Sequence, residues 1–366
     1  MTETEIAAPA VPHLPKWTVA APVVAWGMLA GAMFVAGGWF VAVLAGALVW
    51  AVLAAVHHAE AVAHRVGEPF GTLVLAIAVT LIEVALIVSL MIAGGPATTA
   101  LARDTVFATL MIILNGIVGL CLLVGAMRHR EQTFGVDGVT GALTTLAAIT
   151  VLTLILPNYD MRVPGPVYGP AQLAFIALVS AVLYGVFVLV QTVRHRGYFL
   201  EETPSGVAVD APPPSNRSTT LSATLLLVCL AAVVLLAKKI APTLEAAVAR
   251  AGAPPALVGV IIAGVVLMPE AIAAVRAARQ NRLQTSLNLA LGSALASIGL
   301  TIPAVAIVSL ATGLTLTLGI DLKSTVLLVL SLFVSSLALR TGRTTILQGS
   351  VLLVIFAVYL FTTIVT

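Results

Sequence analysis

Two glutamates lie in stretches of sequence that otherwise suit a lipid environment. Glu83 is the only charged residue in 69–102, and Glu270 is the only one in 251–275. A charged side chain at the centre of a bilayer costs on the order of 2.5 to 3.5 kcal/mol on insertion scales, so such residues mark ion or proton pathways by default. Neither acid has a basic residue three or four positions away on its own helix. A proton, a cation or another helix must therefore compensate each carboxylate. The alternatives without transport are an acid that stays protonated and hydrogen-bonded, or a Glu270 that lies near the interface, six residues from Arg276, and reaches water.

Removal from water favours the neutral form of a carboxyl group, so each acid is suited to exchange a proton for a cation, which is the chemistry of an antiporter. Oxygen ligands suit hard cations such as Ca²⁺ or Na⁺. Pro269 removes a backbone donor and either exposes a carbonyl oxygen through a break in the helix or only kinks it. The supporting oxygen donors that we predict are Thr80, Asn115, Asn288, Ser293 and Ser297. For the small residues around Ser293 and Ser297, close helix packing is the competing interpretation.

The composition places most of the chain in a membrane. Of its 366 residues, 60% are hydrophobic and 9% are charged, and the mean hydropathy is +1.12. A helix needs roughly 20 apolar residues to cross a bilayer. We predict an all-α polytopic membrane protein with eleven transmembrane helices near 17–36, 38–57, 70–94, 103–127, 139–157, 170–193, 219–240, 254–275, 284–311, 318–338 and 344–364. A net charge of +3 with few aromatic residues indicates no nucleic-acid surface.

The acids divide the predicted helices into two related halves. Aligning the apolar stretches on Glu83 and Glu270 places one acid in the third predicted helix and one in the eighth. Because five spans, an odd number, separate these helices, the second acid-bearing helix crosses the membrane in the opposite direction to the first. Such inverted repeats hold the ion site near the midplane. We predict a tail and one extra helix (1–37), a first five-helix repeat (38–195), a flexible linker (196–218) and a second five-helix repeat (219–366). Twelve of the 18 Lys and Arg residues then lie in the cytoplasm if the N-terminus does, which leaves the C-terminus external.

A second polar cluster follows the second predicted helix. Three of its residues share one helical face at i, i+3 and i+7 and form a conceivable metal site: His57, Glu60 and His64. The HExxH arrangement of zinc hydrolases is absent, so an intramembrane metalloenzyme is only an alternative. We expect instead a cytoplasmic entrance that relays protons, lined by His58, His64, Glu68 and Glu245.

Three motifs resemble a known family. "GEPFGTLVLAIAVTLIE" (67–83), "LMPEAIAAV" (267–275) and "NLALGSALASIGLTIP" (288–303) are similar to the bacterial calcium/proton antiporter branch of the cation/proton exchanger (CAX) family, within the Ca²⁺:cation antiporter superfamily. The resemblance implies an eleven-helix fold with paired repeats and two essential glutamates, here Glu83 and Glu270. Eukaryotic members carry Gly-Asn-Ala before each acid and Gln where this chain has Ala296, so the choice among Ca²⁺, Na⁺ and K⁺ stays open.

The predicted function is secondary active transport across a bacterial inner membrane. Cytoplasmic Ca²⁺, or also Na⁺ or K⁺, would be exchanged for external protons by alternating access at the carboxylate pair, without a resident cofactor or an enzymatic reaction. Inorganic cations, protons and the lipid bilayer are the expected partners, and the sequence does not predict an oligomeric state. A channel or uniporter that is independent of the pH gradient is the alternative. No phosphate loop or Ser/His/Asp set favours an enzyme or a nucleotide-driven pump.

Overall fold

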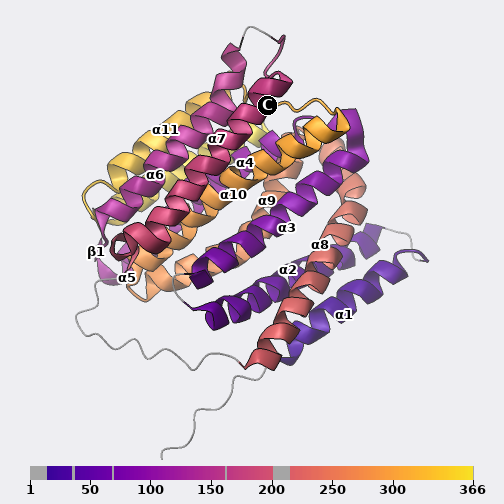
Figure 1. Cartoon of the computed structure of the whole chain (residues 1–366), viewed down its shortest axis with the longest axis horizontal. Helices are drawn as coiled ribbons and strands as arrows, with labels where there is room; N and C mark the ends of the chain where they lie inside the picture. The colour runs from indigo at the N-terminus through magenta and orange to yellow at the C-terminus, as the bar shows by residue number, and fades with distance from the viewer. Residues whose placement is uncertain (1–14, 35–37, 68–69, 161–162, 201–214, 366) are drawn as a thin grey trace, which may run out of the picture.

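The computed structural model describes residues 15–34, 38–67, 70–160, 163–200 and 215–365, and these residues form a bundle of long helices (Figure 1). The α-helices are α1 (Lys16–Gly31), α2 (Gly38–Val66), α3 (Phe70–Gly94), α4 (Leu101–Met111), α5 (Val118–His129), α6 (Val136–Thr150), α7 (Pro170–Leu189), α8 (Asn216–Arg250), α9 (Ala256–Arg279), α10 (Leu283–Thr312), α11 (Leu322–Ala338) and α12 (Ile346–Ile364). The π-helical segment Ile112–Ile117 joins α4 to α5 without a turn. The chain is therefore mostly helical.

Eight helical segments are long and apolar enough to cross a membrane, judged by length and composition: Trp39–Val66, Leu101–His129, Val136–Tyr159, Pro170–Arg194, Asn216–Arg250, Ala256–Arg279, Leu283–Thr312 and Ile346–Ile364. Two shorter apolar helices, Ala76–Ile92 and Leu322–Ala338, accompany them, and α1 has 16 residues. These segments overlap the stretches predicted from hydropathy. The chain is a polytopic membrane protein, while the count of eleven spans stays a prediction.

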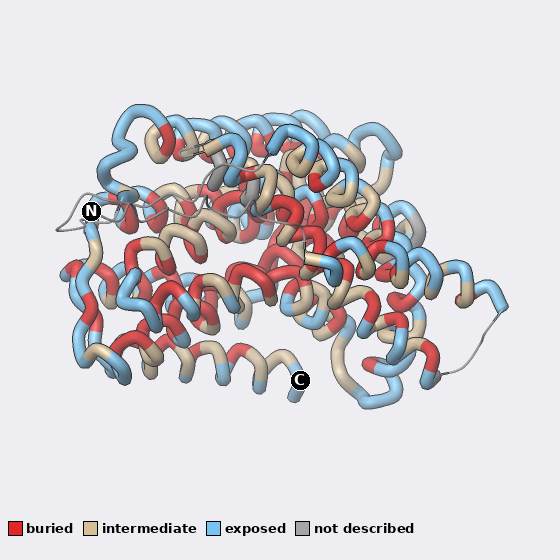
Figure 2. The backbone as a smooth tube through the Cα atoms, turned by 90° about the horizontal axis from the view of Figure 1, so that it is seen from below, coloured by how far each residue is buried: buried red, intermediate tan, exposed pale blue. Residues whose placement is uncertain are grey.

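Apolar side chains cover the outside of the bundle as well as its core. On α7, exposed large residues recur on one helical face: Phe175, Leu178, Val182, Val186 and Leu189. Figure 2 shows that buried and exposed residues alternate along the helices, so each helix presents one face inward and one outward. An outward face of this kind suits lipid and not water. The burial pattern thus agrees with the composition.

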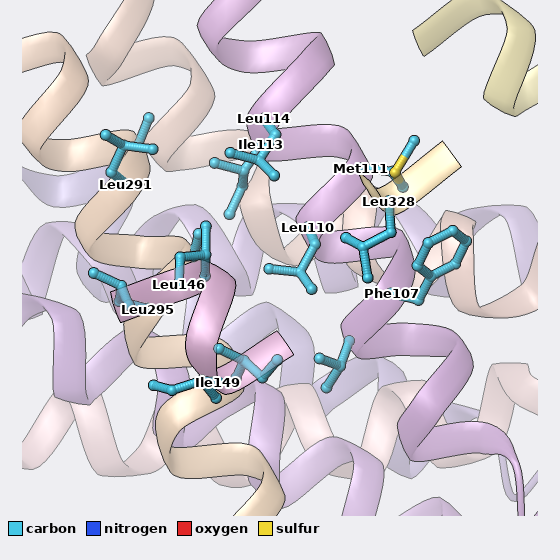
Figure 3. Packing of buried hydrophobic residues seen from close by; sticks show 14 of the residues in the cluster. Phe107, Leu110, Met111, Ile113, Leu114, Leu146, Ile149, Leu291, Leu295 and Leu328 are labelled. Atoms are coloured by element: carbon cyan, nitrogen blue, oxygen red, sulfur yellow. The ribbon is translucent and has the colours of Figure 1, made fainter. Parts of the chain in front are cut away.

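The interior contains two large apolar clusters. The larger one joins α4 and the segment after it to α6, α10 and α11, and Figure 3 shows Phe107, Leu110, Leu146, Leu295 and Leu328 within it. The second cluster joins α1, α2 and α8 to one face of α3. Helix α3 contributes Ile82 and Leu86 to this second cluster, and Ile87 and Met91 to the first. The helix that carries Glu83 therefore lies at the boundary between the two packed units.

Two short antiparallel pairings join turns at the ends of the bundle. Strand β1 (Gln132–Thr133), between α5 and α6, pairs with β2 (Arg343–Thr344), between α11 and α12, and Gln132 lies opposite Thr344. An isolated bridge joins Val167, between α6 and α7, to Thr317, between α10 and α11. Each pairing therefore fastens a turn of the first half of the chain to a turn of the second half.

Of the two alternatives for Pro269, the helix break is absent, and its supporting role at the site stays a prediction. Helix α9 continues as an α-helix from Ala256 to Arg279 with Pro269 inside it. A single proline removes one backbone hydrogen bond, and the turns on either side retain theirs, so neighbouring helices can hold the segment helical. Pro269 therefore lies beside Glu270 within a continuous helix.

Candidate functional site

Glu83 lies in the interior of α3 and is held by two hydroxyl groups. Its residue is 3% exposed. Ser297 on α10 donates to its Oε1 at 2.8 Å, and Thr109 on α4 donates to the same oxygen at 3.2 Å. Within the described ranges no basic side chain acts on this carboxylate. The three helices α3, α4 and α10 thus converge on one buried acid that is compensated only by neutral donors.

Glu270 is buried on α9, and its own backbone donates a hydrogen bond to its carboxyl group. Its residue is 6% exposed, and its Oε2 has no hydrogen-bond partner among the described residues. The charges of Glu83 and Glu60 act on its carboxyl group, and no described base does. An unpaired buried carboxylate is costly, so the group needs a proton or a cation. The two acids therefore share one electrostatic environment.

Small residues allow the helices around these acids to approach closely. Helix α10 packs against α3, α4 and α9. At Gly299 on α10, an added Cβ would lie 2.7 Å from the Cβ of Tyr184 on α7, so only glycine fits there. At Gly259 on α9, an added Cβ would lie 3.3 Å from the backbone nitrogen of Thr105 on α4. These contacts set the positions of the helices that carry Ser297, Thr109 and the acids.

The predicted supporting residues fall into different surroundings. Ser297 contacts Glu83, whereas Thr80 is buried on α3 at 4% exposure and Ser293 is half-buried on α10. Asn115, in the π-helical segment, donates to Ser331 Oγ on α11 at 2.8 Å. Asn288 donates to the carbonyl oxygen of Phe199 and accepts from Gln284 at 2.9 Å. Only Ser297 of this set hydrogen-bonds to an acid within the described part of the chain.

Sequence reasoning missed Thr109. This threonine is fully buried and lies four residues after Thr105, on the same face of α4. Threonine is common in apolar helices, where its hydroxyl usually bonds to a carbonyl of the preceding turn. The spacing of Thr105 and Thr109 is the one signal in the sequence that could have drawn attention to this face.

The residues predicted for an entrance lie at several places. His58 is fully buried on α2, and its Nε2 lies 3.1 Å from the carbonyl oxygen of Thr18 on α1. His64 on α2 and Glu245 on α8 are exposed, and Glu68 lies outside the described residues. No described contact joins His64 or Glu245 to either buried acid. Their role in proton relay stays a prediction.

The alternative metal cluster has little geometric support. In the described ranges no group of three His, Cys, Asp or Glu residues is placed to hold a metal ion. His57 Nδ1 and Glu60 Oε2 are 3.9 Å apart, and the His57 ring lies 5.5 Å from that of Trp17. His57 and Glu60 therefore form a pair, and His64 is exposed at the end of the helix.

A polytopic helical bundle with two buried acids that have no basic partner among the described residues defines a class of protein, the ion-transporting membrane proteins. The chain belongs to the sodium/calcium exchanger protein family, whose model matches residues 33–193 and 221–365. The resemblance inferred from the three motifs is thereby confirmed at family level. The protein is a membrane cation exchanger, since this is a family of transporters.

Two relatives are similar in sequence to most of this chain. A Sinorhizobium fredii (strain NBRC 101917 / NGR234) protein named as an ionic transporter, y4hA, is 49% identical over 318 residues, which cover 86% of each chain. The sodium-potassium/proton antiporter ChaA of Escherichia coli (strain K12) is 36% identical over 310 residues, 84% of each chain.

Two solved structures have the same fold as this chain. YfkE superposes with a TM-score of 0.72 at 16% identity and covers 96% of this chain and 99% of its own. The H⁺/Ca²⁺ exchanger CAX superposes at 0.71 with 17% identity, covering 94% and 87%. At these identities the likeness shows the fold alone.

Proposed function

We propose that the protein is a proton-coupled cation antiporter in which Glu83 and Glu270 together bind either the transported cation or protons. The observation that carries this proposal is the pair itself: two buried carboxyl groups on α3 and α9, of which Glu83 acts by its charge on Glu270, and neither has a basic partner in the described part of the chain. A cation or protons supply the missing positive charge. The site is therefore never charge-balanced without one of its two ligands.

The hydroxyl groups at Glu83 suit an acid that changes protonation state. A hydroxyl can donate one hydrogen bond and accept others, so Ser297 and Thr109 can donate to the ionised carboxylate and accept from its protonated form after a simple rotation. Neither state leaves the buried acid unsatisfied, which keeps the exchange of proton for cation reversible. External protons then displace the cation, and deprotonation on the cytoplasmic side restores the cation site.

Ca²⁺ is the proposed main substrate, with Na⁺ and K⁺ as further substrates. Two carboxylates neutralise a divalent ion, and hydroxyl and carbonyl oxygens are ligands that hard cations prefer. Among the similar proteins, CAX is an H⁺/Ca²⁺ exchanger and ChaA is a sodium-potassium/proton antiporter. The same oxygen-lined site can serve all three ions, and the ligand count around each ion decides the preference.

We further propose the predicted arrangement of one extra helix (1–37) and two inverted five-helix repeats (38–195 and 219–366) joined by the linker 196–218. The family model matches two separate segments, one in each half. In this arrangement the α5–α6 turn corresponds to the α10–α11 turn, and the α6–α7 turn to the α11–α12 turn. The β1–β2 pairing and the Val167–Thr317 bridge are then the same contact made once at each end of the molecule.

Alternating access follows from this arrangement if the two halves expose the site to each side in turn. The distribution of Lys and Arg supports a cytoplasmic N-terminus and an external C-terminus in a bacterial inner membrane. On this orientation α2 and α9 end at the cytoplasmic face, and α4 begins at the external face.

The test is cation-dependent proton flux in everted membrane vesicles. Glu83→Gln and Glu270→Gln each remove a negative charge while keeping the shape of the side chain. Both variants should be present in the membrane at wild-type levels and should lose exchange. Glu131→Gln is the matched control, because Glu131 pairs at 3.6 Å with an exposed arginine, Arg343. Retained exchange in either buried variant refutes the assignment.

A channel or uniporter using the same acids is distinguished by its response to the pH gradient. In the antiporter, an ionophore that collapses the gradient stops uphill cation movement. Cation flux that continues unchanged after the collapse would favour the channel.

A further inference from the structure

Three valines bring the acid-bearing helices together. They form a small buried cluster, separate from the two large ones, with one member on each of α2, α3 and α9: Val56, Val79 and Val266. Four residues after each valine the same helix carries an acid: Glu60, Glu83 and Glu270. Residues four apart lie on the same face of a helix, about one turn along its axis. In the proposed orientation α3 runs opposite to α2 and α9, so Glu60 and Glu270 share a region on one side of the valine contact and Glu83 lies on the other side.

Glu60 acts electrostatically on this region. Its charge acts on the carboxyl group of Glu270, and helices α2 and α9 pack against each other. Two basic side chains act on Glu60 in turn: His57, one turn earlier on α2, and Arg276, six residues after Glu270 on α9. Glu60 is thus an acid whose charge acts on Glu270 and that also feels the charge of an exposed base, Arg276.

Exposure distinguishes Glu60 from the two buried acids. The side chain of Glu60 is 52% exposed, whereas Glu270 is 6% exposed and its Oε2 has no described hydrogen-bond partner. An ion that approaches Glu270 from the end where α2 and α9 finish therefore meets the field of Glu60 first. A fixed charge beside a low-dielectric pathway raises the local concentration of ions of opposite sign.

We propose that Glu60 is an entry carboxylate that concentrates inorganic cations at the cytoplasmic side of Glu270, and that Arg276 opposes it. This role depends on Glu83 and Glu270 being the transport site. Glu60 is then a positioning residue for the incoming ion. It sets the KM for the cation and leaves the maximal rate of exchange unchanged. The neighbouring valines provide an apolar boundary between this entrance and Glu83.

The test is the cation dependence of Ca²⁺/proton exchange in everted vesicles, with Glu131→Gln as the exposed-acid control. Glu60→Gln should raise the KM for Ca²⁺ about tenfold with the maximal rate retained, and Glu60→Asp should restore most of the affinity. Arg276→Gln should lower the KM, because it removes the opposing charge. Both effects should shrink as ionic strength rises, since exposed charges are screened over about 8 Å at physiological salt.

Several results would overturn this role. They are an unchanged KM in Glu60→Gln, a change of the same sign in Glu60→Gln and Arg276→Gln, or effects that are insensitive to salt. If Glu60→Gln does not reach the membrane, Glu60→Asp and Arg276→Gln still decide the question through their salt dependence. Failure of the proposed function is distinguishable, because exchange would then survive in Glu83→Gln or Glu270→Gln. Inactive variants of both buried acids together with a normal KM in Glu60→Gln overturn only the role of Glu60.

Discussion

Removal of the Ser297 hydroxyl offers a quantitative test of how Glu83 is held. Ser297 donates the shorter of the two hydrogen bonds to Oε1 of Glu83, at 2.8 Å. Both residues are buried, since Ser297 is 1% exposed and Glu83 is 3% exposed. A hydrogen bond to a charged group contributes about 1.5 to 3 kcal/mol. Ser297→Ala withdraws this stabilisation from the ionised carboxylate, which is the form that binds the cation. The apparent cation affinity at fixed pH should therefore fall about 10- to 100-fold, since each 1.4 kcal/mol is a factor of ten.

The assay is the KM for Ca²⁺ in proteoliposomes at constant internal and external pH. The matched control is Ser180→Ala on α7, because Ser180 is equally buried at 1% exposure and its hydroxyl has no hydrogen-bond partner in the described part of the chain. The control should keep the wild-type KM. A KM for Ser297→Ala within twofold of the control would refute the view that this hydroxyl supports the cation-binding form of Glu83.

Three further perturbations follow from the packing around the site. Thr109→Val should raise the KM less than Ser297→Ala does in the same assay, because its bond to the acid is longer at 3.2 Å; a larger effect would contradict the geometry. Gly299→Ala should lower the free energy of unfolding of the purified protein by about 1 to 3 kcal/mol through overpacking. Gly292→Ala on the same helix should leave it unchanged, because an added Cβ there meets no atom within 4 Å. Asn115→Ala should lower the free energy of unfolding by a similar amount, because the buried hydroxyl of Ser331 on α11 loses its donor. An unchanged melting temperature would argue against that contact.

Hydropathy alone located the helices well, because each spanning segment must satisfy its own backbone and present apolar side chains. The burial of Glu83 and Glu270 was also predictable, since a lone acid in such a segment has few other places to go. The partners of these acids were not. Ser297 lies more than 200 residues from Glu83 in the sequence, and only the packing of α10 against α3 brings them together.

Thr109 and Pro269 show two limits of reasoning from sequence. Thr150 and Thr153 bond to carbonyls of their own helix, so nothing in residue type separates them from Thr109, which bonds to Glu83. At Pro269 the local rule allowed a break, but the packing of α9 against α4 and α10 keeps the helix continuous. In both cases a tertiary contact decides the outcome.

Glu60 shows that a shared helical face does not identify the partner of a residue. Its spacing with His57 and His64 on a single face offered a metal site as an alternative. In the structure His57 stays close at 3.9 Å, and the more informative neighbours are Glu270 and Arg276 on a helix far along the chain. Helical periodicity identifies which residues share a face, and it does not identify what that face meets.

The central claim is that Glu83 and Glu270 hold either a cation or protons. The most direct measurement is proton release when Ca²⁺ is added to the purified protein in weakly buffered detergent solution. The wild-type protein should release protons on Ca²⁺ binding, and the release should vanish in Glu83→Gln combined with Glu270→Gln while Glu131→Gln behaves as wild type. Ca²⁺ binding without proton release, or release that persists in the double variant, would contradict the account.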